Sequence, residues 1–269
     1  LDPVLQWNFE SGLKDQILHL KANLKNGAAV ENGRLILRKG GYAVTDNLPI
    51  EISEKTLSSW VQLDNLNQRA GGVISIQNLN SGVFDSIVFA EKEPRKWMSG
   101  SNGFSRTKSF PFTPPENLAH NQLVHIAITY SPDGKITGYR NGKMYGKPYT
   151  TSLFKYQKNK SVLTFGVRHL PPRPQRMLHG SISRASVYDR ALTQNEIHAI
   201  FHPDSYASLK EAEKSLSSEE MNLYTKLTAQ RDSLEKRLQE LETTVVADKP
   251  NLQDFALALF NMKEFIYLK

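Results

Sequence analysis

The chain of 269 residues contains no cysteine. This absence excludes disulfide bonds, thiol nucleophiles and cysteine-based zinc sites together. It does not identify the cellular compartment, because a chain of this length can bury a large core and needs no covalent cross-links.

Long hydrophobic runs are lacking as well. No apolar stretch approaches the roughly 20 residues that a membrane-spanning helix requires, and the mean hydropathy is -0.46. We therefore expect no membrane insertion. The first residue is Leu1, and no charged segment followed by an apolar one lies near it. We expect a mature or excised fragment whose targeting signal lies outside the sequence.

Familiar catalytic motifs are also missing. The sequence contains neither a Gly-x-Ser-x-Gly nucleophile elbow nor a Gly-x-x-x-x-Gly-Lys phosphate-binding loop. His198 and His202 have the spacing of two zinc ligands on a helix, but residue 199 is alanine rather than the glutamate of a metalloprotease. A third ligand is not evident, so we do not predict a zinc site.

The net charge of +7 is unevenly distributed. Residues 1–202 contain 25 basic and 15 acidic residues, a net charge of +10, whereas residues 203–269 contain 9 and 12, a net charge of −3. A basic globular part favours anionic partners. Ordinary charge for solubility is the alternative that the sequence leaves open.

The first two thirds of the sequence consist of short segments rich in β-branched and aromatic residues, separated by Gly, Pro or Asn. They predict strands at 34–38, 56–61, 73–77, 86–90, 124–130, 135–140, 162–167 and 181–188. The turn residues Pro132-Asp133-Gly134 and Asn141-Gly142 predict two successive antiparallel connections. Many short strands without intervening helices predict an antiparallel sandwich or barrel.

The last third has a helical periodicity. Thr193 and Glu196 form a capping box that begins a short helix, and Ser217 with Glu220 begins a longer one. An apolar stripe on the longer helix comprises Leu223, Leu227, Leu234, Leu238, Leu241 and Val245, and a final helix is predicted at 252–267. Coiled-coil association and docking of a helical hairpin within the chain are both compatible with this pattern.

Three stretches resemble the laminin G-like family of concanavalin A-like domains. Thr56–Val61 resembles its T-x-x-x-W-V strand, the segment from His125 to Gly142 resembles its H-V-A-x-x-Y…G…Y-x-N-G hairpin, and the segment from Gly180 to Ile197 resembles its closing G-x-I-D-x-x-x-x-Y-x-R-A-L-x-x-x-E-I signature. The resemblance across residues 1–202 implies an all-β, antiparallel two-sheet jelly-roll sandwich. The helical periodicity predicts that residues 203–269 form an α-helical C-terminal extension. We assign four residues to the core of this sandwich: Trp7, Trp60, Tyr130 and Tyr188.

A finer resemblance is to one subgroup of these domains. Phe84-Asp85, Pro94–Trp97, Arg168-His169 and Phe260–Tyr267 carry it. The members are large exported bacterial proteins that combine such a domain with a c-type cytochrome segment and uncharacterised domains. The resemblance implies an extracytoplasmic location, periplasmic or secreted. The chain has no Cys-x-x-Cys-His, so any haem segment lies outside it.

Glucanases that resemble this fold carry Glu-x-Asp-x-x-Glu on one strand, where alternation directs the carboxylates into one cleft. This sequence lacks that pattern. The nearest pairs, Glu51 with Glu54 and Glu91 with Glu93, lack the central Asp, and we interpret them as solvated surface. We therefore predict that the protein is not an enzyme, and a glycoside hydrolase is the least favoured alternative.

Related domains often hold a structural calcium through an Asp of the closing signature and an acidic residue near the N-terminus. This sequence has Ser183 at the first position and Asp15 as the candidate for the second. Because Ca²⁺ needs several oxygen ligands including carboxylates, a hydroxyl weakens such a site. We predict no cofactor and keep calcium at Asp15 as a hypothesis.

Aromatic and basic residues gather in two stretches that we interpret as loops, 95–108 and 168–176. The candidate ligand-binding residues are Arg95, Trp97, Phe104, Arg106, Arg168, His169 and Arg176. Sugar rings stack on aromatic faces, and arginine binds sulfate or carboxylate through two hydrogen bonds. If the two stretches meet, they form a site for an anionic polysaccharide. Alternatively, Trp97 caps a sheet and the arginines are solvated or paired with acids.

The leading hypothesis is a non-catalytic carbohydrate-binding module for sulfated or uronic polysaccharide within a larger exported protein. The alternative is a structural domain that packs against neighbouring domains of its parent chain. The apolar stripe of the C-terminal extension favours this alternative. Nucleic acid binding is disfavoured, because the basic residues form no stripe and the sequence has no RNA-binding signature.

Overall fold

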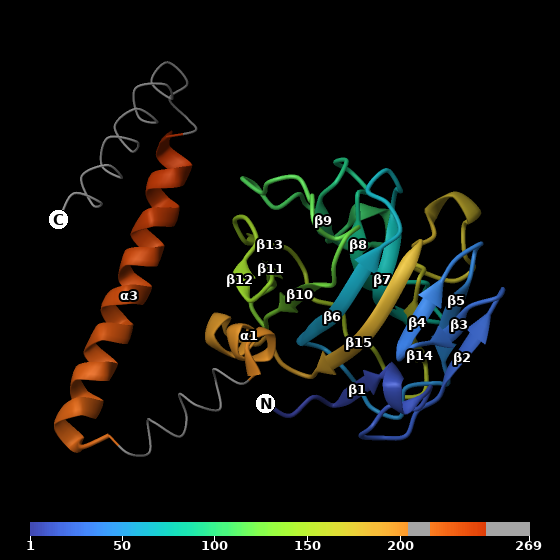
Figure 1. The fold of residues 1–269 in the computed structure, drawn as a ribbon, viewed down its shortest axis with the longest axis horizontal. Helices are drawn as coiled ribbons and strands as arrows, with labels where there is room; N and C mark the ends of the chain where they lie inside the picture. The colour runs from blue at the N-terminus through green and yellow to red at the C-terminus, as the bar shows by residue number, and fades with distance from the viewer. Residues whose placement is uncertain (204–215, 246–269) are drawn as a thin grey trace. The chain divides into compact units, whose positions relative to one another are not determined.

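The computed structural model of the protein describes residues 1–203 and 216–245 (Figure 1). The chain divides into two units, Leu1–Ser205 and Tyr206–Lys269, and each is described by itself. The first unit is an antiparallel β-sandwich, which confirms the predicted fold class. The assignment of residues 1–202 to a sandwich domain and of 203–269 to a helical extension stays a prediction.

Two antiparallel sheets form the sandwich. The nine-stranded sheet contains, in spatial order, β12 (Lys143–Met144), β11 (Lys135–Arg140), β10 (Val124–Tyr130), β6 (Lys55–Leu63), β15 (Gly180–Tyr188), β4 (Arg34–Leu37) and β3 (Ala29–Glu31), with β1 (Leu5–Asn8) paired to β15 and β13 (Tyr149–Thr150) paired to β11. The six-stranded sheet contains β2 (Ala22–Lys25), β5 (Tyr42–Thr45), β14 (Ser161–Phe165), β7 (Gly71–Asn78), β8 (Phe84–Phe89) and β9 (Trp97–Ser101) in that order.

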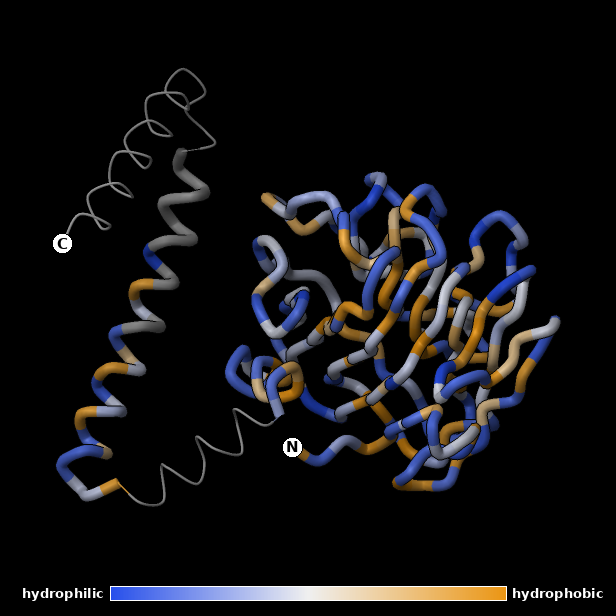
Figure 2. The backbone as a smooth tube through the Cα atoms, viewed as in Figure 1, coloured by the Kyte–Doolittle hydropathy of each residue, from blue (hydrophilic) through white to orange (hydrophobic). Residues whose placement is uncertain are grey.

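The core lies between the sheets, because side chains alternate between the two faces of a strand. On β6, Leu57 and Val61 are buried in this core, whereas Ser58 and Trp60 lie on the outer face. Hydrophobic residues accordingly concentrate in the strands and hydrophilic ones in the connecting loops (Figure 2).

The four aromatic residues expected in the core have different positions. Trp7 and Tyr130 are confirmed in the main core, with exposed fractions of 0% and 1%. Tyr188 belongs to a smaller cluster with Ile197 on the outer face of the nine-stranded sheet. The assignment of Trp60 to the core is wrong, because it is only partly buried.

The predicted hairpin is confirmed residue by residue. Strand β10 pairs with β11 from Ile126 opposite Arg140 to Tyr130 opposite Ile136, and Gly134 in the connecting turn has a φ of 78°. A left-handed conformation of this kind favours glycine. The remaining predicted strands are also present, with small shifts at their ends.

One predicted loop is a strand. The stretch 95–108 was expected to be irregular, but its first part is β9, which pairs with β8 and is buried along its whole length. Polar and small residues such as Ser99 and Gly100 concealed this edge strand, because they do not carry the β-branched signature on which the prediction depended. Only the following residues, Asn102–Phe104, form a short 3-10 turn, η2.

Both predicted capping boxes are present. Helix α1 (Gln194–Phe201) begins after Thr193, whose hydroxyl accepts from the Glu196 amide, and helix α3 (Ser218–Val245) begins after Ser217 in the same way with Glu220. The helix predicted at 252–267 lies outside the described residues, as do the side chains of Leu238, Leu241 and Val245. Among the described residues, every helix is too short or too polar to span a bilayer.

Candidate functional site

A pocket of about 410 Å³ lies beside the six-stranded sheet, and we call it the arginine pocket. It is lined by Gly82, Phe84, Glu91, Ser101, Asn102, Gly103, Phe104, Arg168, His169, Arg173 and Arg176. The two stretches singled out in the sequence therefore do meet. Four of the seven candidate ligand-binding residues line this pocket: Phe104, Arg168, His169 and Arg176.

The three arginines come from the segment that follows β14. Gln77 on β7 holds this segment against the sheet, since its side-chain amide donates to the Leu170 carbonyl at 3.0 Å and accepts from the Leu170 amide at 2.6 Å. Gly72, also on β7, permits the close approach, because a Cβ atom there would lie 2.6 Å from the backbone of Val167 and Arg168. Contacts with β7 thus hold the segment that carries the three arginines.

Glu91 forms ion pairs with two of these arginines. Its side chain is 1% exposed, and Oε1 forms an ion pair with the guanidinium of Arg168 and a longer one, at 3.4 Å, with that of Arg176. Its second oxygen, Oε2, is buried without a hydrogen-bond partner among the described residues. The interpretation of Glu91 as solvated surface is therefore wrong.

The pocket stays positively charged at neutral pH. Burial lowers the pKa of Arg168 to about 10, and the neighbouring arginines act in the same direction. Burial also lowers the pKa of His169, and the cation of Arg168 lowers it further, so His169 is neutral at pH 7. Three guanidinium groups face one carboxylate, and Arg173 is exposed, with no acidic group within ion-pair distance among the described residues.

The opposite wall of the pocket is built by residues 101–104. Phe104 is 44% exposed, and Asn102 and Ser101 are held from behind by Arg106. The Arg106 guanidinium donates to the Phe84 carbonyl at 2.9 Å and to Asn102 Oδ1 at 3.4 Å. Arg106 is itself buried, so it supports the wall rather than the ligand.

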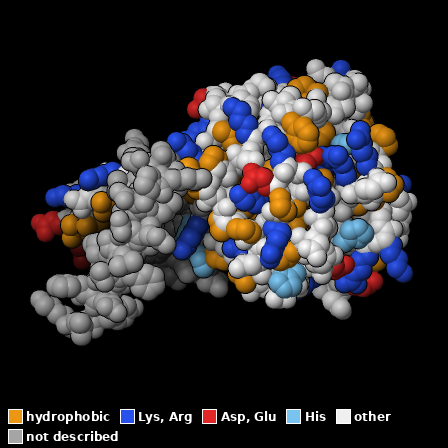
Figure 3. Space-filling model, turned by 90° about the horizontal axis from the view of Figure 1, so that it is seen from above, with side chains coloured by type: hydrophobic (Ala, Val, Ile, Leu, Met, Phe, Trp, Pro, Cys, Tyr) orange, Lys and Arg blue, Asp and Glu red, His pale blue; other side chains and the backbone are white. Residues whose placement is uncertain are grey.

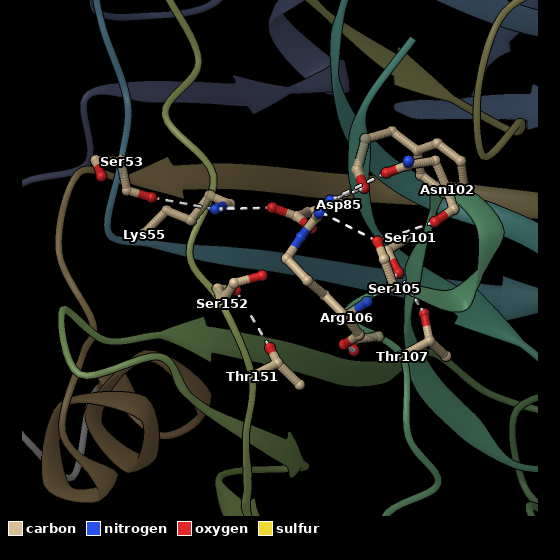
Figure 4. A network of polar contacts seen from close by, with 12 residues as sticks. Ser53, Lys55, Asp85, Ser101, Asn102, Ser105, Arg106, Thr107, Thr151 and Ser152 are labelled. Carbon is tan, nitrogen blue, oxygen red and sulfur yellow. Dashed lines mark hydrogen bonds and ion pairs between the residues drawn. The ribbon is translucent and has the colours of Figure 1, made fainter. Parts of the chain in front are cut away.

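Arg106 belongs to a buried charged network (Figure 4). Asp85 on β8 accepts from Arg106 Nε at 2.9 Å and forms an ion pair of 3.0 Å with Lys55 on β6. Burial would raise the pKa of Asp85, but Lys55 and Arg106 outweigh it and lower that pKa. The Lys55 ammonium also lies 4.3 Å from the centre of the Tyr130 ring. Sequence reasoning missed this network, because a lysine in a strand carries no sign of its burial.

Three of the candidate residues lie outside the pocket lining. Trp97 is 2% exposed, packs on Phe89 at 4.7 Å between ring centres and donates from Nε1 to Glu116 Oε2 at 2.7 Å. It is a core residue, so its assignment as a ligand-binding surface residue is wrong. Arg106 is 5% exposed, so its assignment as a ligand-binding surface residue is wrong as well. Arg95 is exposed but donates to the Glu116 carbonyl at 3.1 Å.

The acidic residues considered for catalysis do not converge. Glu51 is exposed and pairs with Lys155 at 2.7 Å, and Glu93 pairs with Lys96 at 2.6 Å. Within the arginine pocket, Glu91 is the single acidic residue among the lining side chains. Hydrolysis of a glycosidic bond by acid and nucleophile needs two carboxyl groups.

The carboxylate of Asp15 accepts three hydrogen bonds from backbone amides of its own loop. Oδ1 accepts from the amides of Ile17 and Leu18, and Oδ2 accepts from that of Leu20 at 2.5 Å. The described residues contain no group of three or more His, Cys, Asp or Glu side chains that could hold a metal ion. The residues at Asp15 therefore do not fit calcium, and His198 with His202 has no third ligand of these types within the described part of the chain.

The fold of this chain resembles that of several solved structures. No curated protein matches the sequence. Among solved structures, domain 4 of AbnA, an extracellular arabinanase from Geobacillus stearothermophilus in complex with arabinotriose, is similar over 73% of this chain and 97% of that domain, with 16% identity and a TM-score of 0.56.

Two further structures are similar over only part of their length. The binding domain of botulinum neurotoxin DC in complex with SialylT is similar over 74% of this chain and 50% of that one, with 13% identity and a TM-score of 0.52. Trypanosoma rangeli sialidase, in complex with a difluorinated nononic acid, is similar over 73% of this chain and 32% of that enzyme, with 17% identity and a TM-score of 0.54. At these identities the likeness shows the fold.

The family profile described as "Concanavalin A-like lectin/glucanases superfamily", of the Laminin_G_3 type, matches residues 37–198, more than half of the chain. The matched region contains the predicted hairpin, the whole closing signature and every residue that lines the arginine pocket. The chain belongs to the concanavalin A-like lectin/glucanases superfamily.

Proposed function

We propose that the sandwich is a non-catalytic carbohydrate-binding module whose ligand is an anionic polysaccharide. The observation that carries this proposal is the arginine pocket, in which Arg168 and Arg176 share a single carboxylate and Arg173 has no acidic partner among the described residues. Guanidinium groups bind sulfate and carboxylate through paired hydrogen bonds. The exposed ring of Phe104 provides an apolar surface for a sugar ring at the rim.

The relatives support a glycan as the ligand class. The AbnA domain was solved with arabinotriose and the neurotoxin binding domain with SialylT. The preference for acidic glycans is inferred from this chain alone. Its sandwich presents more basic than acidic side chains on the face shown in Figure 3, and residues 1–202 have a net charge of +10.

Titration calorimetry of the full chain with heparin, polygalacturonate and neutral arabinan tests the proposal. We expect the two anionic polymers to bind and their affinity to fall as the salt concentration rises, because exposed charges are screened. Arg173→Ala is expected to weaken binding about tenfold, the effect of one lost charge-assisted hydrogen bond. Arg69→Ala is the matched control, because Arg69 is exposed and lies outside the pocket lining. Equal affinity of Arg173→Ala and Arg69→Ala for the anionic polymers would contradict binding in the arginine pocket.

A second candidate role concerns the extension. On α3, Leu223, Leu227 and Leu234 are 56%, 54% and 62% exposed. This stripe supports an interaction with neighbouring domains of a larger parent protein, as the alternative hypothesis holds. Light scattering of the full chain and of a Leu227→Glu variant tests for self-association through the stripe. Self-association that Leu227→Glu abolishes would show that the stripe binds a second copy of the chain, which would contradict this role.

The setting of the protein is also a proposal. We infer an extracytoplasmic location, in keeping with the finer resemblance to exported bacterial proteins and with the extracellular arabinanase among the relatives. Fractionation of cells that express the full-length protein tests this inference. The presence of a cytochrome segment in the parent chain stays a prediction.

A further inference from the structure

A second pocket, of about 360 Å³, lies on the outer face of the nine-stranded sheet, and we call it the sheet pocket. Its lining residues are Asn8, Glu10, Asn32, Gly33, Arg34, Trp60, Leu123, Ser183 and Arg184. None of them lines the arginine pocket, which belongs to the other sheet. The two pockets are therefore separate sites on one sandwich.

The register of the strands places a row of side chains across this face. Asn8 on β1 is paired with Arg184 on β15, Arg184 with Trp60 on β6, and Trp60 with His125 on β10. Paired residues on neighbouring strands point to the same side of a sheet. Three of these four residues line the sheet pocket, so the pocket is a direct product of the strand pairing.

A β-bulge adds Ser183 to the side chains on this face. The pairing of β15 with β6 shifts between Ile182 and Arg184. Ile182 and Ala185 are both buried in the core, which leaves Ser183 and Arg184 together on the outer face. Bulges re-aim side chains in this way and are frequent next to binding sites.

The charges of the pocket are unsatisfied within the described part of the chain. Arg184 and Glu10 are exposed, and neither has an oppositely charged group within ion-pair distance among the described residues. Arg34 is held by a hydrogen bond of 2.8 Å from Nη1 to Gln62 Oε1. Two cations, one anion and two asparagine amides thus line one hollow, and no ion pair forms between them.

Trp60 forms an apolar wall of fixed orientation. Phe201 of α1 stacks on the indole with 5.4 Å between ring centres and 12° between the planes, and His125 lies beside it at 5.3 Å. The rest of the indole faces the pocket. Polar groups converging on a rigid aromatic surface are the usual chemistry of sugar recognition.

We propose that the sheet pocket is a second subsite of the glycan-binding module and takes an acidic sugar residue. Arg184 binds the carboxylate or sulfate, Asn8 and Glu10 bind ring hydroxyls, and Trp60 contacts the apolar face or edge of the ring. This inference rests on the proposed function and adds to it that one chain has two binding sites on different sheets. A polysaccharide long enough to reach both gains affinity by avidity, whereas a short oligosaccharide does not.

The experiment uses short probes that fill the sites independently. A heparin hexasaccharide and an oligogalacturonate of the same length are titrated by calorimetry into the wild-type chain, Arg184→Ala, Arg173→Ala and the control Arg69→Ala. We expect two sites per chain in the wild type and the control. In each of the other two variants we expect one site to keep its affinity and the other to be weakened about tenfold. Arg184 is exposed, so its removal leaves the fold intact, which thermal unfolding verifies.

Tryptophan fluorescence supplies an independent readout. Of the three tryptophans, Trp7 and Trp97 are 0% and 2% exposed and Trp60 is the partly exposed one. Binding in the sheet pocket is expected to change the emission and to protect Trp60 from acrylamide quenching. Trp60→Phe is expected to abolish this change while the binding in the arginine pocket persists.

The outcomes separate the two proposals. A single site that Arg173→Ala weakens and Arg184→Ala leaves unchanged overturns the second subsite and keeps the proposed function. A single site that only Arg184→Ala weakens keeps the sheet pocket and overturns the arginine pocket. Absence of binding to every probe overturns both.

Discussion

The carboxylate of Asp85 and the ammonium group of Lys55 are 3.0 Å apart in the centre of the sandwich, with side chains 1% and 0% exposed. Asp85 belongs to the six-stranded sheet and Lys55 to the nine-stranded one, so this ion pair connects the two layers. The Arg106 guanidinium on the other side of Asp85 extends the connection to the wall of the arginine pocket. The core of the sandwich and the wall of the arginine pocket are thereby linked by one buried carboxylate.

Removal of the two partners is expected to have unequal effects. Asp85→Asn leaves two buried cations facing each other, and loss of one partner of a buried pair costs about 3–5 kcal/mol. Lys55→Met leaves Asp85 paired with Arg106, so we expect a clearly smaller loss. Urea denaturation of both variants measures the free energy of unfolding. A Lys55→Met variant less stable than Asp85→Asn would contradict this account.

Trp97 and Phe104 are expected to show opposite phenotypes. Trp97→Phe removes the donor to Glu116 and part of a buried ring, which we expect to cost about 2 kcal/mol of stability without weakening glycan binding. Phe104→Ala, at an exposed position, is expected to leave stability within about 0.5 kcal/mol and to weaken binding. Denaturation and calorimetry on both variants test this crossed pattern, and a loss of affinity in Trp97→Phe equal to that in Phe104→Ala would contradict it.

His125 is expected to make the sandwich acid-sensitive. Burial lowers its pKa from 6.5 to about 4, and its Nε2 lies 2.8 Å from the Ser58 hydroxyl. Between these values the unfolded chain takes up a proton that the folded chain does not, so stability falls as the pH decreases. A shift of this size corresponds to about 3 kcal/mol, fully present above the unfolded pKa.

The pH dependence of unfolding in the wild type and in His125→Gln checks this expectation. The variant should show a flatter stability profile between about pH 6.5 and 4. Glu116 acts in a lower window, because hydrogen bonds from Arg140 and Trp97 outweigh burial and hold its pKa at about 2 rather than 4.5. Parallel profiles of the two proteins between about pH 6.5 and 4 would show that His125 does not cause the loss of stability there.

Gly72 is expected to be indispensable for the arginine pocket. Gly72→Ala places a Cβ atom against the backbone of Val167 and Arg168, so we expect a loss of about 2 kcal/mol by overpacking together with weaker glycan binding. Gly27→Ala is the control, since Gly27 has a positive φ but open space around it. It should cost about 1 kcal/mol and leave binding unchanged. Equal glycan affinities of the two variants would show that binding does not depend on Gly72.

Local signals made much of the fold predictable. Pro132-Asp133-Gly134 predicts a tight turn wherever it occurs between two apolar segments, and the hairpin of β10 and β11 forms at the expected residues. The capping boxes at Thr193 and Ser217 predict helix starts for the same reason, because each depends on residues only three positions apart. The meeting of the stretches around Phe104 and Arg168 was foreseen only as a possibility.

The sequence by itself determined the class of the protein, an antiparallel sandwich with basic and aromatic residues near its loops, because alternation and turn chemistry are local properties. Only the tertiary structure decided which of those residues a ligand can reach. Trp97 and Phe104 are seven positions apart, yet one is in the core and the other at the rim of a pocket. Burial depends on which distant segments pack together, as Glu91 does with Arg168, and that pairing is a property of the whole folded chain.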